Sequence, residues 1–320
     1  MNEHDQLKTV IVGRESFKFT DIQDTHFKEF YGSSSGFSII KHFKEKVKNL
    51  SKRNEYLDNL SSIFIDKDIK VLRPNIENNI DSNIRDFLVI LNDTILICNP
   101  YLDTRKEGYK KYIDLVNDYK LIYAPRTDEY IKRDVYQYDM EKGIEQFEKS
   151  SNEYFPLFDA ANILKCNNGL IMNISNHNEY SGYLWLKEQI DIQIYPVFID
   201  NSHIDGALNI VNDDILLICF DSSIITESNF IKKLPKHLQT YKDIITVDKT
   251  YDNKNVIASK GGMFINILSI NHNTVIVDKE SEYVIEQLKL RGLEVIELDV
   301  HGSRLFGGGI HCTTLDLKRF

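Results

Sequence analysis

Short apolar runs alternate with polar turns along most of the chain. Four stretches share one plan, in which an apolar run, a turn rich in Asn, Asp or Gly and a second apolar run follow one another. Asn, Asp and Gly tolerate the left-handed backbone of tight turns, and β-branched runs favour strands. The pattern therefore predicts four β-hairpins, over residues 87–98, 162–173, 207–219 and 266–278.

A helix-like stretch and then another apolar strand follow each predicted hairpin. The predicted helices cover residues 109–117, 182–189, 230–241 and 281–291. The strands that follow them cover residues 120–124, 192–198, 243–247 and 293–298. A fifth and less regular copy opens the chain, with a strand at 9–12, a largely helical stretch at 36–64 and a strand at 68–72.

The sequence thus contains five β-β-α-β units. Their hairpin turns are unevenly spaced, so the chain is not a solenoid of fixed period. Recurring units of mixed strand and helix suit a closed, propeller-like ring, which leaves few strand edges exposed. We predict an α/β fold of five units around a pseudo-fivefold axis, as a single domain over residues 1–320, with the polar stretch 128–153 as a surface insertion.

Composition and charge exclude several classes of function. The 320 residues are 42% hydrophobic and 27% charged, which is ordinary for a globular protein. A net charge of −9 argues against nucleic acid and anionic membranes as partners. The polar, acidic first residues do not resemble a signal or transit peptide, and no apolar run is long enough to cross a bilayer. We therefore expect a cytoplasmic protein with small-molecule partners, and we leave a homodimer open.

The four cysteines, at positions 98, 166, 219 and 312, form no C-x-x-C pair and no His/Cys metal spacing. We therefore expect reduced thiols, no metal and no cofactor. Three of the cysteines lie in or beside strand-like runs, where a thiol acts as a small hydrophobe. Cys312 differs, because it follows Gly307-Gly308-Gly309 in a polar setting. Such a run suits a backbone that must approach another group closely.

Four acidic or basic side chains stand just ahead of predicted hairpins. His203 and Asp205 are two residues apart, so an extended chain would direct both to one face. Asp159 and Asp86 precede two other hairpins, and equivalent positions converge in a ring of units. Taken singly, each residue also fits a turn, a solvated loop or a surface ion pair.

The C-terminal stretch resembles the signature of a known family. Gly-Gly-Gly-Ile-His-Cys-Thr-Thr over residues 307–314, followed by Asp316 and Arg319, is similar to the motif of the amidinotransferases, the relatives of glycine amidinotransferase. The resemblance implies the pentein fold, with Cys312 as the nucleophile. His311 beside it would point away on an extended chain, so we expect it to play a supporting role.

The resemblance extends to three earlier segments. His203-Ile-Asp205 matches the family's general acid/base and one carboxylate that holds the guanidinium of the donor. Phe-Asp-Ala-Ala at 158–161 implies that Asp159 orients the histidine, and Arg85-Asp86 implies that Asp86 is a second carboxylate for the guanidinium. Ser259 would help hold the amino-acid end of the donor.

The implied reaction moves the amidino group of L-arginine to an amine acceptor through a covalent amidino-cysteine and releases ornithine. The chain departs from the family pattern at four positions: Asn162 for an Asp, Ser202 for a Met, Ala258 for a Ser, and Ser222 for the arginine expected at the donor carboxylate. These departures leave the identity of the acceptor open.

Two alternatives remain at this point. An arginine deiminase-like guanidine hydrolase would share the fold and the Cys/His/Asp set, with water in place of the acceptor. A non-catalytic pentein would bind without reacting, but the joint presence of Cys312, His203, Asp159 and Asp205 argues against it. The Gly-Gly-Gly-x-His-Cys motif favours transfer over hydrolysis.

Overall fold

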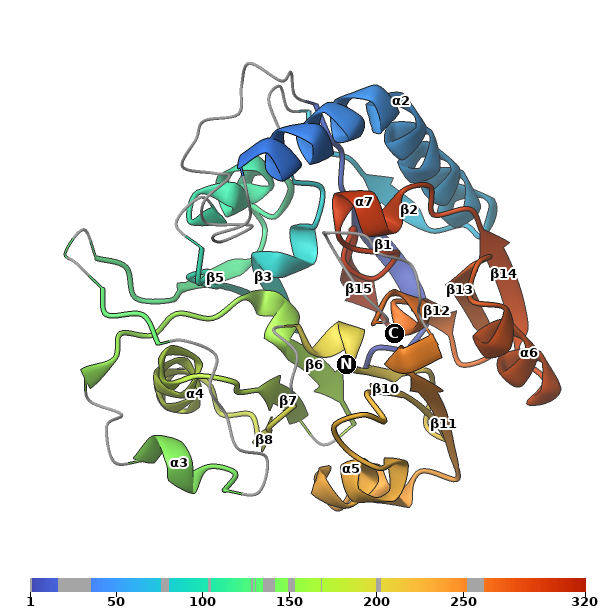
Figure 1. The fold of residues 1–320 in the computed structure, drawn as a ribbon. Coiled ribbons are helices and arrows are strands. Elements are labelled where there is room, and N and C mark those ends of the chain that lie inside the picture. Colours follow the sequence, from blue (N-terminus) through green and yellow to red (C-terminus); the bar gives the residue numbers. More distant parts are fainter. Residues whose placement is uncertain are drawn as a thin grey trace.

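Five three-stranded sheets are arranged in a ring, which confirms the predicted five-unit α/β fold (Figure 1). The computed structural model describes residues 2–16, 36–75, 81–102, 105–127, 129, 131–134, 142–148, 153–167, 169–199, 203–251 and 262–320. Only part of the predicted insertion at 128–153 falls within these ranges.

Four sheets combine one hairpin with a third strand, as the pattern predicts. The second strand of the hairpin is central, antiparallel to the first strand and parallel to the third. The strands are β3 (Leu88–Leu91), β4 (Thr94–Ile97) and β5 (Lys120–Tyr123); β6 (Ile163–Cys166), β7 (Gly169–Asn173) and β8 (Ile194–Val197); β9 (Leu208–Ile210), β10 (Ile215–Phe220) and β11 (Asp243–Asp248); and β12 (Leu268–Asn271), β13 (Thr274–Asp278) and β14 (Glu294–Leu298).

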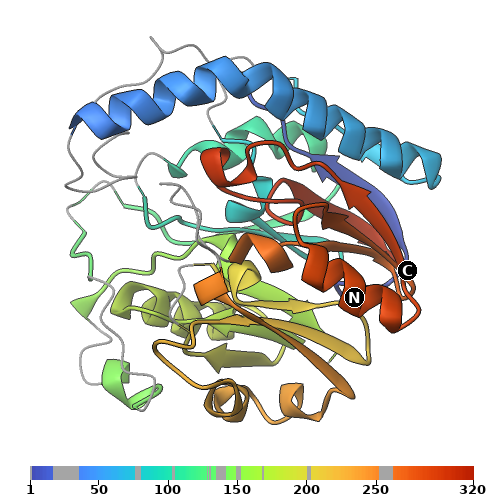
Figure 2. The same ribbon diagram turned by 45° about the vertical axis from the view of Figure 1, so that its right-hand side comes forward.

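The two ends of the chain build the fifth sheet together. Strand β15 (Thr314–Arg319) pairs antiparallel with β1 (Leu7–Val12), which pairs parallel with β2 (Lys70–Leu72). The backbones of Gln6 and Phe320 exchange two hydrogen bonds of 3.0 Å. Both termini therefore lie on one side of the molecule (Figure 2). The partner of β1 was not predicted, because no turn joins these two strands.

The outside of the ring is covered by α2 (Gly36–Asp66), α3 (Glu145–Glu148), α4 (His177–Gln189), α5 (Glu227–Lys233) and α6 (Glu282–Leu290), whereas the short α7 (Ser303–Phe306) lies inward of α2 (Figure 1). Among the described residues, no helix combines the length and the apolar character needed to cross a membrane.

Two helix predictions need correction. The predicted helix at 109–117 is a pair of 3₁₀ segments, η4 (Gly108–Lys111) and η5 (Ile113–Leu115). Glycine and β-branched residues such as Ile113 and Val116 weaken an α-helix there. The helix predicted over 230–241 ends at Lys233, because Pro235 disfavours helical backbone before it and offers no amide hydrogen; η9 (Leu238–Thr240) follows.

Short 3₁₀ turns precede the four hairpins and face the axis of the ring. They are η2 (Ile84–Asp86), η7 (Ala160–Asn162), η8 (Ile204–Gly206) and η11 (Gly262–Ile265); η10 (Lys249–Tyr251) instead follows β11. These turns contact one another in sequence, η2 with η7, η7 with η8, and η8 with η11.

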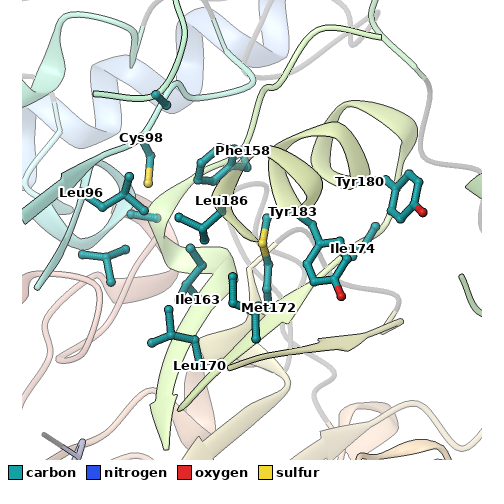
Figure 3. Packing of buried hydrophobic residues seen from close by; sticks show 14 of the residues in the cluster. Leu96, Cys98, Phe158, Ile163, Leu170, Met172, Ile174, Tyr180, Tyr183 and Leu186 are labelled. Atoms are coloured by element: carbon teal, nitrogen blue, oxygen red, sulfur yellow. The ribbon is translucent and has the colours of Figure 1, made fainter. Parts of the chain in front are cut away.

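Apolar clusters between neighbouring units hold the ring together. In the cluster of Figure 3, Met172 of β7 and Leu186 of α4 pack with Leu96 and Cys98 of the preceding unit. All four side chains are at most 1% exposed. Burying one such side chain contributes about 1.5–3 kcal/mol, so each boundary between units is a substantial source of stability.

A buried carboxylate ties three parts of the ring at its axis. Asp316 of β15 accepts hydrogen bonds of 2.7 Å from Arg85 Nη2 and from Arg319 Nε, and a further one from Lys165 Nζ of β6. Burial alone would raise the pKa of Asp316, but the charges of Lys165, Arg85 and Arg319 hold it well below its usual value. The carboxylate therefore stays ionised.

The Asp316→Asn variant should be strongly destabilised, by roughly 3–5 kcal/mol, because it leaves buried cations without their partner. Urea denaturation followed by circular dichroism measures the change. Asp299→Asn, which breaks an exposed pair with Lys279, is the matched control and should stay near the wild type. Equal stability of the two variants would contradict the role given to Asp316.

Candidate active site

The axis-facing turns bring one side chain or more from every unit to a common place. Asp86 ends η2, Asp159 precedes η7, and His203 precedes η8, which contains Asp205. Cys312 lies in the turn before β15 and comes from the sheet that the two ends of the chain build. The remaining unit contributes Asn266, just after η11, which the sequence analysis missed. Its place ahead of β12, equivalent to that of the other residues, was the available signal.

The glycine run allows Asn266 to reach Cys312. A Cβ atom on Gly309 would lie 2.7 Å from Asn266 Oδ1, so any larger residue would push that side chain away. Gly308 has φ +104°, which other residues rarely adopt. Asn266 Oδ1 accepts a hydrogen bond of 3.2 Å from the amide of Cys312, and Nδ2 donates one of 3.0 Å to the sulfur. The loop and its thiol are thereby fixed.

Asp205 contacts both Cys312 and the adjacent His311. The thiol donates a hydrogen bond of 3.1 Å to Asp205 Oδ2, and His311 Nδ1 lies 2.9 Å from the same oxygen. The expectation that His311 points away is therefore wrong, because residues 310–313 form a turn and not an extended strand. Burial would raise the pKa of Asp205, but His311 above all lowers it to about 2. An ionised carboxylate only accepts, so Nδ1 of His311 carries the hydrogen.

The thiol of Cys312 is held in its neutral form. Burial, followed by the negative charges of Asp205 and Asp86, raises its pKa well above the ordinary value. Its side chain is only 5% exposed. A thiolate is a far better nucleophile than a thiol, and a positive charge beside Asp205 and Asp86 would lower the pKa of Cys312.

His203 lies between two carboxylates. Its Nε2 is 2.8 Å from Asp159 Oδ2, and its Nδ1 is 3.7 Å from Asp86 Oδ1. Burial lowers the pKa of His203, but Asp86 and Asp159 together outweigh it and raise the pKa to about 9. The imidazole is therefore protonated at neutral pH and can act as an acid.

Arg105 is a second residue that the sequence analysis missed, because it belongs to no motif. It approaches the axis from the loop after β4. Its Nη1 lies 2.9 Å from Asp86 Oδ2 and 3.2 Å from Asp159 Oδ2, and its Nη2 lies 3.1 Å from Asp81. It compensates part of the negative charge and, through its own charge, lowers the pKa of His203.

Asp86 is fully buried and incompletely paired. Neither carboxylate oxygen accepts a hydrogen bond from the described residues, although Arg105 lies beside Oδ2. Burial raises the pKa of Asp86 to about 7, against the charges of Arg105 and His203. A cationic ligand that approached Oδ1 would supply the missing partner.

The next residues to place are Ser259 and three positions at which the chain departs from the family pattern. Ser259, together with Ala258 and Ser202, lies outside the described residues. Ser222 lies on the surface after β10, where its amide donates a hydrogen bond of 3.2 Å to Asp248. Its hydroxyl oxygen is 3.4 Å from that of Thr250. This position therefore offers a hydroxyl group where the family resemblance predicts an arginine.

Known proteins resemble this chain in sequence and in fold. No protein-family model matches the chain. Mitochondrial glycine amidinotransferase of Xenopus laevis is 23% identical over 355 residues, which cover 99% of this chain and 82% of that protein.

The structure of inosamine-phosphate amidinotransferase from Streptomyces griseus matches with a TM-score of 0.74 at 22% identity, over 99% of this chain and 95% of that one. Dimethylarginine dimethylaminohydrolase from Pseudomonas aeruginosa matches with a TM-score of 0.60 at 14% identity, over 98% and 100% of the two chains. The chain therefore has the pentein fold of these proteins and is similar in sequence, over nearly its whole length, to the amidinotransferases.

Proposed function

We propose that this protein transfers the amidino group of L-arginine to an amine acceptor, through an amidino group carried covalently on Cys312, with release of ornithine. Its amidinotransferase relatives support amidino transfer in general. The observation that carries the proposal is the buried Asp86 carboxylate with unfilled hydrogen-bonding capacity, next to a neutral thiol and a protonated histidine.

The donor binds by its guanidinium group. This group is planar and permanently charged, and carboxylates recognise it through paired hydrogen bonds. Asp86 and Asp205 are the carboxylates for this task, and Asp205 already accepts a hydrogen bond of 3.1 Å from the Cys312 sulfur. The guanidinium carbon is thereby placed beside the thiol.

Donor binding also activates the nucleophile. The negative charges of Asp205 and Asp86 contribute to the raised pKa of Cys312. A cation between them compensates those charges and so lowers the thiol pKa. The thiol proton leaves to solvent, and the thiolate is formed only when the donor is in place.

Transfer then proceeds in two balanced steps. In the first, the sulfur bonds to the guanidinium carbon, the bond from that carbon to the ornithine nitrogen breaks, and His203 gives this nitrogen a proton. In the second, neutral His203 takes a proton from the acceptor amine, whose nitrogen bonds to the carbon as the thiolate leaves. Nε2 of His203 is held by Asp159, so Nδ1 exchanges the protons.

The Cys312→Ser variant should lose turnover by at least about 10³-fold but still bind arginine, because the carboxylates remain and only the nucleophile is lost. Product formation is followed by chromatography and binding by calorimetry. His203→Asn should also stop turnover. Cys166→Ala, a change at the far end of β6, is the control and should stay active. A serine variant with near wild-type turnover would exclude Cys312 as the nucleophile.

The pH dependence of kcat/KM should be bell-shaped. Asp86 has a raised pKa of about 7 and must be ionised to bind the donor, so kcat/KM rises as pH increases through about 7. His203 has a raised pKa of about 9 and must be protonated to act as the acid, so kcat/KM falls above about 9.

Initial rates at low arginine from pH 5 to 10 measure this profile. Arginine binding to Cys312→Ser should weaken below pH 7 in the same way, since it reports Asp86 without the chemistry. A profile that is flat through pH 7 in both measurements would contradict the role of Asp86.

Transfer should dominate over hydrolysis, since Gly307-Gly308-Gly309-Ile310-His311-Cys312 resembles the transferases. Ornithine should appear in step with a new guanidino compound when arginine is incubated with a panel of primary amines. With the active amine, double-reciprocal plots should give parallel lines, because the donor product leaves before the acceptor enters. Steady release of citrulline and ammonia, unchanged by every amine, would instead establish hydrolysis.

A further inference from the structure

A second polar cluster, formed by His4, Asp213 and His272, lies at the opposite end of the ring from the active site. Asp213 is in the hairpin turn between β9 and β10, and His272 is in the turn between β12 and β13. The active-site residues stand ahead of these hairpins. A strand rises about 3.3 Å per residue. The cluster and Cys312 are therefore separated by about the length of the hairpin strands. The proposed reaction does not use it.

The three side chains have the spacing of a metal site. His4 Nε2 is 3.1 Å from Asp213 Oδ1, and His272 Nε2 is 3.4 Å from Asp213 Oδ2. One ligand atom from each residue lies within 4.8 Å of the other two. Atoms bound tetrahedrally to zinc at about 2.0–2.1 Å are about 3.4 Å apart. Each histidine lies at about this separation from one of the two Asp213 oxygens. Rotations of the half-exposed Asp213 and His272 side chains would bring one oxygen and the two nitrogens around a common ion.

The backbone that carries the ligands is already fixed. His4 is fully buried, and its segment is held where Asn2 donates a backbone hydrogen bond of 2.8 Å to Asp5 Oδ2. The side chain of Arg319 donates a hydrogen bond of 2.7 Å from Nη1 to the Asp5 carbonyl. Asn212 Nδ2 donates a hydrogen bond of 2.9 Å to the His272 carbonyl, and so joins the two turns. An ion would therefore bind at little cost in ordering.

We propose that His4, Asp213 and His272 bind one divalent transition-metal ion, with zinc as the metal best suited to two imidazoles and one carboxylate. Magnesium and calcium prefer ligand sets made of oxygen alone. Asp213 and His272 are each 49% exposed, which leaves a fourth position open to water. The ion connects the N-terminal segment to two hairpin turns, and so stabilises the folded chain.

The test titrates zinc chloride into EDTA-treated, dialysed protein in the Cys312→Ser background, which removes the active-site thiol as a competing ligand. Calorimetry should show about one ion per chain, and thermal unfolding should shift to higher temperature with zinc but not with magnesium. His272→Ala and Asp213→Asn alter half-exposed side chains and leave the core intact. Each should weaken zinc binding at least about tenfold.

His237→Ala is the matched control. His237 is another histidine near a possible zinc ligand, since its Nε2 lies 3.9 Å from the Cys166 sulfur. This variant should bind zinc like its parent. The proposal is overturned if the parent shows no saturable binding up to about 100 times the protein concentration, or if His272→Ala and Asp213→Asn both keep the affinity of the parent. Loss of binding in His237→Ala alone would place the ion elsewhere.

Discussion

The ion pairs of Asp316 join three units of the ring. A carboxylate that is 0% exposed requires charged partners, and it obtains them from Arg85, Lys165 and Arg319. The same Arg85 donates a backbone hydrogen bond of 3.3 Å to the Cys312 carbonyl, and its Nε donates one of 3.0 Å to the His311 carbonyl. The residue after it is Asp86. A contact that we predict to be important for stability thus also sets the loop of Cys312 against one of the carboxylates proposed to bind the donor.

The candidate active site has more acidic than basic side chains. Asp81, Asp86, Asp159 and Asp205 surround it, while Arg105 and His203 supply positive charge. In low dielectric such an arrangement cannot keep every acid ionised, and burial leaves Asp86 near the midpoint of its titration at neutral pH. A planar cation would offset the excess negative charge. In the proposed reaction, donor binding and activation of the thiol would therefore arise from the same change in charge.

Local patterns predicted much of the architecture, because each hairpin carries its own turn signal and lies within about a dozen residues. Prediction failed where a strand pairs with one far away in the sequence, and where a functional residue is of a type that is common in loops and turns. Nothing beside β1 indicates that β15 will pair with it from the other end of the chain. Asn266 looked like an ordinary strand-flanking residue, and Arg105 like one of many loop cations. His4, Asp213 and His272 are separated by up to 268 positions, so no linear spacing could reveal their cluster.

The closing of the ring by β15 has a consequence for how the protein is made. On the ribosome, β1 emerges long before its antiparallel partner β15, because the other four sheets lie between them in the chain. Throughout elongation one edge of β1 has no native strand beside it, and such edges invite pairing with other chains. The ion pairs of Asp316 with Arg85 and Lys165 likewise need β15 in place. In the proposed reaction, the complete set of reactive groups would therefore be assembled only after β15 has paired with β1.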